Sequence, residues 1–255
     1  MPESGFVFEG GEAIDVGQHG DTDLVYHQGD PVPNTGQSSL VFEQGVGLGG
    51  GVIIDDFERG DLSPYSGDTG RFAVVTSGAL EGTYSGAIGS MNTDDGSVRI
   101  YSLEGDGLPN YFELGDTLRM NFVYDSEDQD FEINWAHDST DPYGNHYWAE
   151  LDPENNQQFR LGGRDSGSNF GTYAGTDWDG SPYVGQELIW ELDWADDGTV
   201  TSTLLDLSEN TIVSISGKDG RYDGNVSIGY DVNPQGLGSG LNEGDIRWDS
   251  VRKVV

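Results

Sequence analysis

Apolar and polar residues alternate along several short stretches of the chain. The clearest are residues 118–124 and 190–194, in which every second residue is apolar. A two-residue period places neighbouring side chains on opposite faces of a β-strand, so each stretch predicts a strand with one buried face. The Asp196-Asp197-Gly198 sequence after the second stretch is typical of a β-hairpin turn.

The same reasoning predicts strands through most of the chain after residue 50. They are expected at residues 51–58, 71–75, 85–90, 98–101, 117–124, 131–136, 147–151, 158–161, 188–194, 199–206, 211–216, 225–231 and 246–254. Forty glycines and nine prolines interrupt the sequence too often for helices of ordinary length. Short strands without intervening helices indicate antiparallel sheets packed as an all-β sandwich.

Two stretches of similar composition bound this predicted domain. Residues 52–58 follow a run of three glycines, and residues 245–252 lie close to the other end of the sequence. We expect them to be the first and last strands of one sandwich and to lie side by side. The predicted organisation is therefore an arm over residues 1–50 and a sandwich domain over residues 51–255.

Residues 1–50 contain a weak internal repeat. Phe6-Val7-Phe8, Leu24-Val25-Tyr26 and Leu40-Val41-Phe42 are each followed, after two residues, by a glycine. Such short strands cannot bury an apolar face alone, which favours an extended assembly arm that orders against partner subunits. The alternative is a disordered linker, consistent with eight acidic residues and no Lys or Arg in this segment.

The net charge of the chain restricts the classes of partner that it can bind. Eleven basic and 46 acidic residues give a net charge of −35, which disfavours nucleic acid and anionic membrane surfaces as partners. Salt screens the self-repulsion of such a surface, so the composition predicts a protein from a high-salt environment. The sequence has no cysteine, and we expect no signal peptide and no membrane insertion, because Met1-Pro2-Glu3 precedes no apolar segment.

Several motifs resemble one family. They are Ile54-Asp55-Asp56-Phe57-Glu58, Glu81-Gly82-Thr83-Tyr84, the hairpin at residues 190–201, and Ile246-Arg247-Trp248-Asp249. Together they resemble the concanavalin A-like, laminin-G-like jelly-roll domains of haloarchaeal surface and tailed-virus structural proteins. The resemblance covers residues 51–255 and implies an antiparallel jelly-roll β-sandwich. The repeats of residues 1–50 are similar to leader segments of haloarchaeal tailed-virus proteins.

The resemblance also implies a calcium site. In jelly-roll carbohydrate-binding domains a cation often bridges acidic residues of the first and last strands. The matching positions are Asp55, Asp56, Glu58 and Asp249. Carboxylate oxygens are the ligands that Ca²⁺ prefers, but any two strands of so acidic a chain bring carboxylates together.

A second carboxylate pattern has the spacing of a hydrolase. Retaining glycoside hydrolases of this fold use acidic residues that alternate along one strand, and Glu150-Leu151-Asp152-Pro153-Glu154 alternates in this way. Pro153 lacks a donor for the sheet and favours a turn, which predicts that Glu154 leaves the strand. Chance alternation in an acidic chain is the simpler explanation, so we expect no enzyme, with a glycoside hydrolase as the alternative.

Aromatic and polar residues gather in the predicted loops at 137–146 and 163–183. Sugars bind to aromatic faces flanked by hydrogen-bonding side chains, often on loops above a rigid sheet. The candidate glycan-binding residues are Tyr143, His146, Arg164, Asn169, Tyr173 and Trp178. Trp135 and Trp148 lie within predicted strands and are expected in the core.

These observations predict a structural protein on the surface of a haloarchaeal virus. It would be a head turret, a capsid decoration or a tail-fibre subunit. The arm at residues 1–50 would bind other virion proteins and form a homo-oligomer, and the outer lectin-like domain would bind a host surface glycan. The alternative is a cellular carbohydrate-binding module or weak hydrolase.

Overall fold

A computed structural model describes residues 51–125, 130–152, 158–234 and 240–254, together with the backbone of residues 6–9, 12–15, 24–27 and 30–33. At residues 169–172 it describes the backbone alone. The chain divides into two compact units, Met1–Phe42 and Glu43–Val255.

The first unit contains two antiparallel hairpins. Strand β1 (Phe6–Glu9) pairs with β2 (Glu12–Asp15), and β3 (Leu24–His27) pairs with β4 (Asp30–Pro33). The first two predicted repeats therefore form strands, each paired with the segment that follows it. The third repeat, at residues 40–42, lies outside the described residues.

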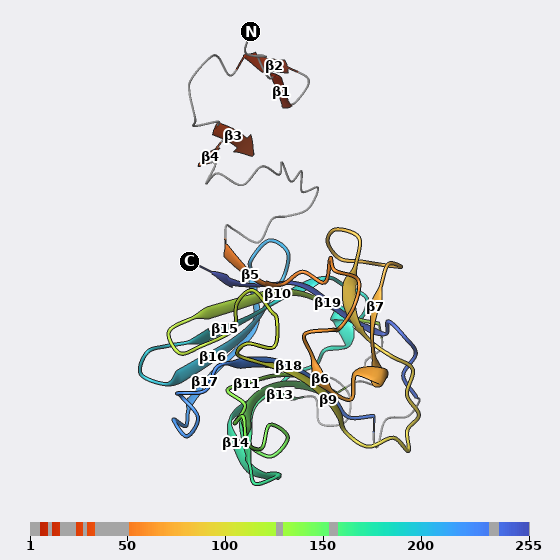
Figure 1. Ribbon diagram of the computed structural model, residues 1–255, viewed down its shortest axis with the longest axis vertical. Helices are drawn as coiled ribbons and strands as arrows, with labels where there is room; N and C mark the ends of the chain where they lie inside the picture. The colour runs from red at the N-terminus through yellow and green to blue at the C-terminus, as the bar shows by residue number, and fades with distance from the viewer. Residues whose placement is uncertain are drawn as a thin grey trace. The chain divides into compact units, whose positions relative to one another are not determined.

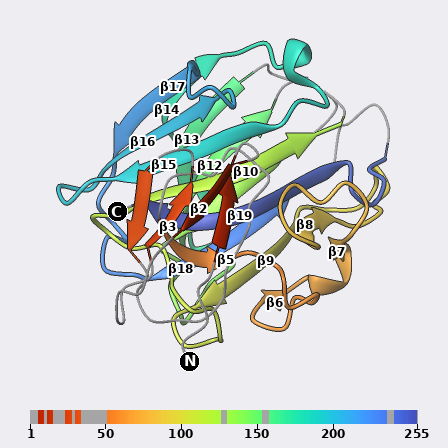
Figure 2. The ribbon, with the colours of Figure 1, turned by 90° about the horizontal axis from the view of Figure 1, so that it is seen from above.

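The second unit is a sandwich of two antiparallel sheets (Figure 1). In the larger sheet, of eight strands, the order is β17-β16-β15-β10-β19-β8-β7, with β5 also paired to β19 (Figure 2). Its strands are β5 (Gly51–Asp55), β7 (Phe72–Val75), β8 (Ser85–Ile88), β10 (Thr117–Tyr124), β15 (Leu188–Trp194), β16 (Thr199–Leu205), β17 (Thr211–Lys218) and β19 (Ile246–Val254).

The other sheet has seven strands in the order β14-β13-β12-β11-β18-β9-β6. They are β6 (Ser66–Gly67), β9 (Val98–Leu103), β11 (Phe131–Trp135), β12 (His146–Asp152), β13 (Gln158–Asp165), β14 (Ser168–Asp177) and β18 (Ser227–Val232). Two short 3-10 helices, η1 (Thr69–Arg71) and η2 (Ser181–Tyr183), complete the described part. In that part, no helix has the length and apolar character needed to cross a membrane.

The predicted pairing of the first and last strands of the sandwich is confirmed. Gly51 lies opposite Val254, and Asp55 lies opposite Val251, with a register shift between Val251 and Arg252. The predicted all-β class is confirmed as well, because the described sandwich consists of two antiparallel sheets.

Alternation places one face of each sheet in a shared aromatic core. In β10, Leu118, Met120 and Phe122 are fully buried in this core. The ring of Trp248 in β19 lies 4.6 Å from that of Tyr230 in β18, so the two sheets meet through aromatic side chains. Burial of each such ring contributes roughly 1.5–3 kcal/mol, which is how a chain with only 34% apolar residues holds a large sandwich together.

The prediction of a loop at residues 163–183 is partly wrong. Strand β14 occupies Ser168–Asp177 and pairs with β13, with register shifts near Gly162 and Gly163. Alternating apolar residues are lacking here, because glycine and polar residues dominate the stretch. Pairing with β13 supplies the order that the local sequence does not indicate.

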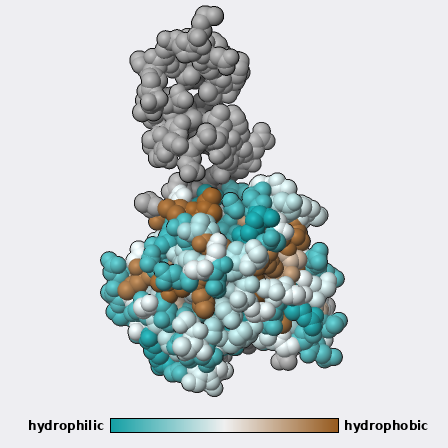
Figure 3. Space-filling model, viewed as in Figure 1, coloured by the Kyte–Doolittle hydropathy of each residue, from teal (hydrophilic) through white to brown (hydrophobic). Residues whose placement is uncertain are grey.

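The surface of the sandwich is mainly polar. The face shown in Figure 3 is largely hydrophilic, with small separate apolar patches. Among the described residues, the large apolar side chains that are well exposed are Val52, Ile53, Tyr143 and Leu207. Tyr143 is also one of the predicted glycan-binding residues.

Candidate functional site

The outer face of the seven-stranded sheet is unusually polar. Alternate residues of β12, namely Tyr147, Ala149 and Leu151, pack in the core. The residues between them, including Trp148 and Glu150, therefore lie on the opposite face. The same alternation holds in the neighbouring strands, so polar side chains from five strands share this outer face.

Five charged residues form a line across that face, which we call the charged row. Each member lies directly opposite the next on the adjacent strand. From β9 to β13 the order is Arg99, Asp231, Glu132, Glu150 and Arg160. Three carboxylates thus lie side by side between two guanidinium groups, although like charges directly opposite one another destabilise a sheet.

Ion pairs close both ends of the charged row. Arg99 pairs with Asp231, which also accepts a 2.7 Å hydrogen bond from Ser97 Oγ. At the other end Arg160 pairs with Glu150 and lies 3.9 Å from an oxygen of Asp152. The middle residue, Glu132, has acidic neighbours on both sides.

The middle of the row is buried, with Glu132 8% exposed and Glu150 4% exposed. Burial and the Asp231 and Glu150 carboxylates raise the pKa of Glu132 well above its ordinary value. Burial and the same kind of repulsion raise the pKa of Asp130, which directly precedes β11. One oxygen from each of Asp130, Glu132 and Glu150 lies within 4.8 Å of the others.

Tyr143 lies beyond the Arg99 end of the row. The residue is 41% exposed, and its hydroxyl donates a 3.1 Å hydrogen bond to Asp68 Oδ2. Arg99 lies 5.7 Å from the ring centroid, and Tyr101 packs edge-on at 5.7 Å. Burial and the Asp68 carboxylate raise the pKa of Tyr143 to about 12, so the hydroxyl stays protonated and can donate. We call Tyr101 and Tyr143 the tyrosine platform.

Two other predicted glycan-binding residues lie at the same end of the sheet. His146 is opposite Arg164 in the pairing of β12 with β13. His146 is fully buried, and its ring stacks on His137 at 5.0 Å between centroids. Burial, with Arg99 nearby, lowers the pKa of both histidines well below its ordinary value.

The remaining predicted glycan-binding residues are placed differently. Trp178 belongs to the core and stacks on Tyr183 with 6.0 Å between centroids. Tyr173 lies in strand β14, not in a loop, and packs against Tyr147. Asn169 pairs with Arg164 through the backbone of β14, but its side chain lies outside the described residues.

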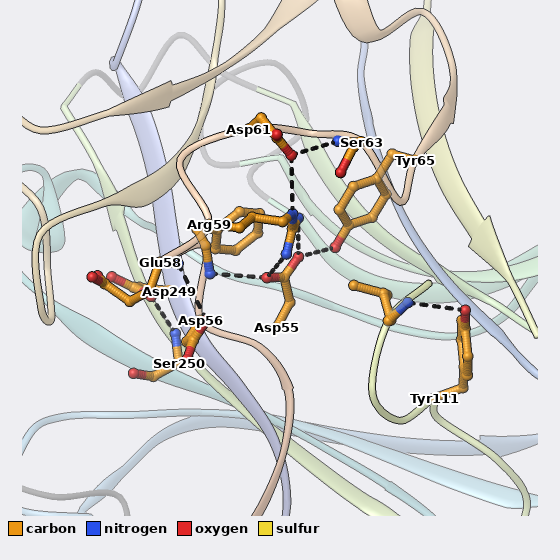
Figure 4. Close-up of polar contacts among 12 residues, drawn as sticks. Asp55, Asp56, Glu58, Arg59, Asp61, Ser63, Tyr65, Tyr111, Asp249 and Ser250 are labelled. Carbon is orange, nitrogen blue, oxygen red and sulfur yellow. Dashed lines mark hydrogen bonds and ion pairs between the residues drawn. The ribbon is translucent and has the colours of Figure 1, made fainter. Parts of the chain in front are cut away.

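The residues predicted to bind calcium already have hydrogen-bond partners. Asp55 and Asp249 lie in β5 and β19 of the other sheet, and Asp56 and Glu58 follow β5. Asp55 accepts hydrogen bonds from Arg59 Nη1 at 2.6 Å, Arg59 Nη2 at 2.9 Å and Tyr65 Oη at 2.7 Å (Figure 4). This pairing already compensates the charge that a cation would neutralise.

The other members of that predicted site accept hydrogen bonds from β8, from the segment before it, or from the nearby backbone. Asp249 accepts a 2.7 Å hydrogen bond from Ser85 Oγ, and burial raises its pKa to about 7. Glu58 accepts hydrogen bonds from backbone amides of that segment, and Asp56 accepts one from Glu58 N. In the described part of the chain, the group whose three carboxylates approach closely enough for one ion is Asp130, Glu132 and Glu150.

The structure describes two of the three acidic residues whose spacing resembles that of a hydrolase. Glu150 and Asp152 lie on the outer face of β12, and that strand ends at Asp152. Glu154 lies outside the described residues. The sequence did not indicate that Glu132 would lie between Glu150 and Asp231.

A scan against protein-family models finds no match to the sequence, and a search of curated proteins finds none either. Solved structures do resemble the chain. A glycoside hydrolase family 16 endo-glucanase from Bacteroides ovatus has 12% identity and a TM-score of 0.53, covering 78% of this chain and 98% of its own. A Bacillus licheniformis beta-glucanase has 9% identity and a TM-score of 0.52, covering 81% and 99%.

A legume lectin-like domain from Entamoeba histolytica has 8% identity and a TM-score of 0.50, covering 75% of this chain and 89% of its own. The sandwich has a jelly-roll fold. At these identities the similarity shows the fold alone, because one fold supports many functions.

Proposed function

We propose that the sandwich binds carbohydrate on the outer face of its seven-stranded sheet, at the tyrosine platform. One observation carries this proposal: Tyr143 exposes 41% of its surface while Asp68, Arg99 and Tyr101 hold it in place. A fixed aromatic ring loses little conformational freedom when a sugar stacks on it. Solved structures of similar fold include an endo-glucanase and a lectin-like domain, which is consistent with this proposal.

The platform has polar groups suited to sugar hydroxyls. Asp68 accepts hydrogen bonds from the Tyr143 hydroxyl and from Arg99 N, and a carboxylate has lone pairs for more than two donors. Arg164 lies opposite His146 and brings further donors to this end of the sheet. In this arrangement Tyr143 binds the apolar face of a sugar ring, and the charged groups around it orient the hydroxyls.

Removal of the ring tests the proposal. Tyr143→Ala should weaken binding to a soluble polysaccharide at least tenfold, in line with the loss of roughly 1–3 kcal/mol of stacking. Affinity electrophoresis against mixed-linkage β-glucan, galactomannan and chitin oligosaccharides would measure it. Leu207→Ala removes another exposed apolar side chain, from the connection between β16 and β17, and should bind like the wild type. Equal retardation of Tyr143→Ala and the wild type would contradict the proposal.

Glycoside hydrolysis is the second candidate function. It is favoured by Glu132, which lies opposite Glu150 on the adjacent strand and whose pKa is raised by burial and its acidic neighbours, since retaining hydrolases use two neighbouring carboxyl groups. We rank hydrolysis below sugar binding because both carboxyl groups are buried, and a substrate would have to reach them. Hydrolysis would be established if the wild type released reducing ends from a polysaccharide and Glu150→Gln did not. Glu191→Gln, on the other sheet, is the control and should remain active.

We infer that the protein is displayed on a virion from a high-salt environment. The net charge of −35 and the hairpin-containing unit before the sandwich support this inference. In about 2–3 M salt, where the Debye length is below about 3 Å, the full chain should be a homo-oligomer and a chain starting at Gly51 a monomer. Mass measurement would decide, with circular dichroism as the control for folding. If both the full chain and the shortened chain were monomers, residues 1–50 would have no role in assembly.

A further inference from the structure

The carboxylates around the charged row outnumber the guanidinium groups paired with them. Arg99 pairs with Asp231, and Arg160 pairs with Glu150. Among the described residues, Asp130 and Glu132 have no ion-pair partner, although Glu132 is buried and Asp130 is partly buried. A buried carboxylate without compensation is costly, so these two groups require either protons or a cation.

Asp130 supplies a second and separate observation. Its Oδ1 is inaccessible to solvent and has no hydrogen-bond partner. Its carboxylate nevertheless faces Glu132 and Glu150, with one oxygen from each of the three residues within 4.8 Å of the others. Buried polar atoms are nearly always satisfied, so an unpartnered, inaccessible oxygen on a carboxylate that approaches two others indicates a missing ligand.

We propose that Asp130, Glu132 and Glu150 bind one hard divalent cation of the Ca²⁺ type. Ca²⁺ binds oxygen at about 2.3–2.6 Å, so two oxygens on one ion lie no more than about 5 Å apart. The 4.8 Å limit on the three oxygens is compatible with a single shared ion. Carboxylates are hard ligands, and a set without nitrogen or sulfur favours Ca²⁺ over transition metals.

The neighbours of the three residues fit this role. Glu150 binds Arg160 through Oε1, which leaves its other oxygen to face the ion. Asn134 Nδ2 lies 3.2 Å from Glu132 Oε2 in the orientation that satisfies both amide atoms, and it orients that carboxylate. The ion joins β11 to β12 and removes the repulsion between two carboxylates that face each other across the strand pair.

The site differs from the calcium site expected from the sequence. There, Arg59 and Tyr65 bind Asp55, and Ser85 binds Asp249. The proposal also stands apart from sugar binding, because the tyrosine platform lies beyond the Arg99 end of the row.

Metal binding to the full chain tests the proposal. After EDTA treatment and dialysis into about 2 M KCl, the protein would be titrated with Ca²⁺ by calorimetry and with Tb³⁺ by luminescence excited through tryptophan. We expect one ion per chain, and displacement of Tb³⁺ by Ca²⁺. At a hundredfold excess of Ca²⁺ over Kd, the thermal midpoint should rise by about 5–10 °C.

Four variants locate the ion. Glu132→Gln and Asp130→Asn should each weaken Ca²⁺ binding at least tenfold. Glu191→Gln, on the other sheet, and Asp249→Asn, at the site expected from the sequence, should bind like the wild type. Loss of binding in Asp249→Asn with retention in Asp130→Asn would overturn the proposal. The proposal would also be overturned if the wild type did not bind one ion per chain. The carboxylates would then share protons instead. The wild-type titration decides even if Glu132→Gln folds poorly.

Discussion

Asp55 illustrates how single residues stabilise this acidic protein. Its carboxylate is 1% exposed and accepts hydrogen bonds from Arg59, Tyr65 and the amide of Phe57. Although acidic residues are abundant, this one is fixed by a guanidinium and a hydroxyl at the start of the sandwich. A buried ion pair is costly to break from one side, because the remaining charge loses its partner.

Asp55→Asn should therefore lower the free energy of unfolding by roughly 2–4 kcal/mol, a range reduced because Arg59 remains partly solvated. Urea denaturation at neutral pH would measure it. Asp56→Asn is the matched control, since Asp56 accepts one exposed hydrogen bond from Glu58 N. An equal effect of the two substitutions would mean that the Arg59 pair adds nothing to stability.

The stacked histidines predict a second residue-scale effect. Burial, together with Arg99, lowers the pKa of His137 and His146 in the folded protein, so the unfolded chain binds protons more readily below its ordinary histidine pKa of about 6.5. Stability from this pair is therefore fully present above that pH and is lost as the pH falls. Between pH 7.5 and pH 5.5 the loss should be roughly 1–3 kcal/mol.

A difference measurement separates the effect of the histidine pair from that of the carboxylates. Some of these, such as Glu132, have a raised pKa, and others, such as Asp206, have a lowered one. The urea midpoint of the wild type should fall further between these two pH values than that of the double variant His137→Gln/His146→Gln. Parallel behaviour of the two proteins would exclude the pair as the source of acid sensitivity.

At the scale of elements, the close approach of β8 to the core depends on a glycine. A Cβ added at Gly86 would lie 2.7 Å from Phe57 Cζ and 2.8 Å from Trp248 Cε2. Neither ring can move without disturbing the aromatic core. Gly86 thus lets β8 pair with β19 directly above two large side chains.

Gly86→Ala should cost about 1–3 kcal/mol of unfolding free energy, because overpacking forces the core rings from their positions. Gly96→Ala serves as the control, since an added Cβ there meets nothing within 4 Å. Thermal or urea unfolding of both variants would be compared. If Gly86→Ala matched the wild type, the rings would have more freedom than their packing indicates.

The strands themselves could be predicted because most carry their own alternation. Residues 117–124, 188–194 and 246–254 form strands with the predicted bounds. Strand β14 could not be predicted, since its glycines and polar residues show no period. The charged row could not be predicted either: alternation assigns Glu132 and Glu150 to one face, but the register that makes them neighbours depends on long-range pairing.

At the scale of the whole molecule, charge dominates the response to solvent. With a net charge of −35, surface carboxylates repel one another at low ionic strength. The thermal midpoint should therefore rise steadily from about 0.2 to 2 M KCl as the Debye length falls below about 3 Å. Scanning calorimetry would measure it. A variant with Asp94, Asp196 and Asp197 changed to Asn should show a flatter rise, whereas equal slopes would point to a general effect of salt on apolar burial.

The pairing of β5 with β19 also determines how the sandwich responds to tension. Gly51 and Val254 lie opposite each other at one end of this antiparallel pair. A force that separates these two residues breaks the hydrogen bonds between the strands one after another, starting at that end, and does not load them all at once. Force transmitted through the segment before Gly51 against an anchored Val254 would therefore peel β5 away at low load, while the remaining strands of the jelly roll stay paired.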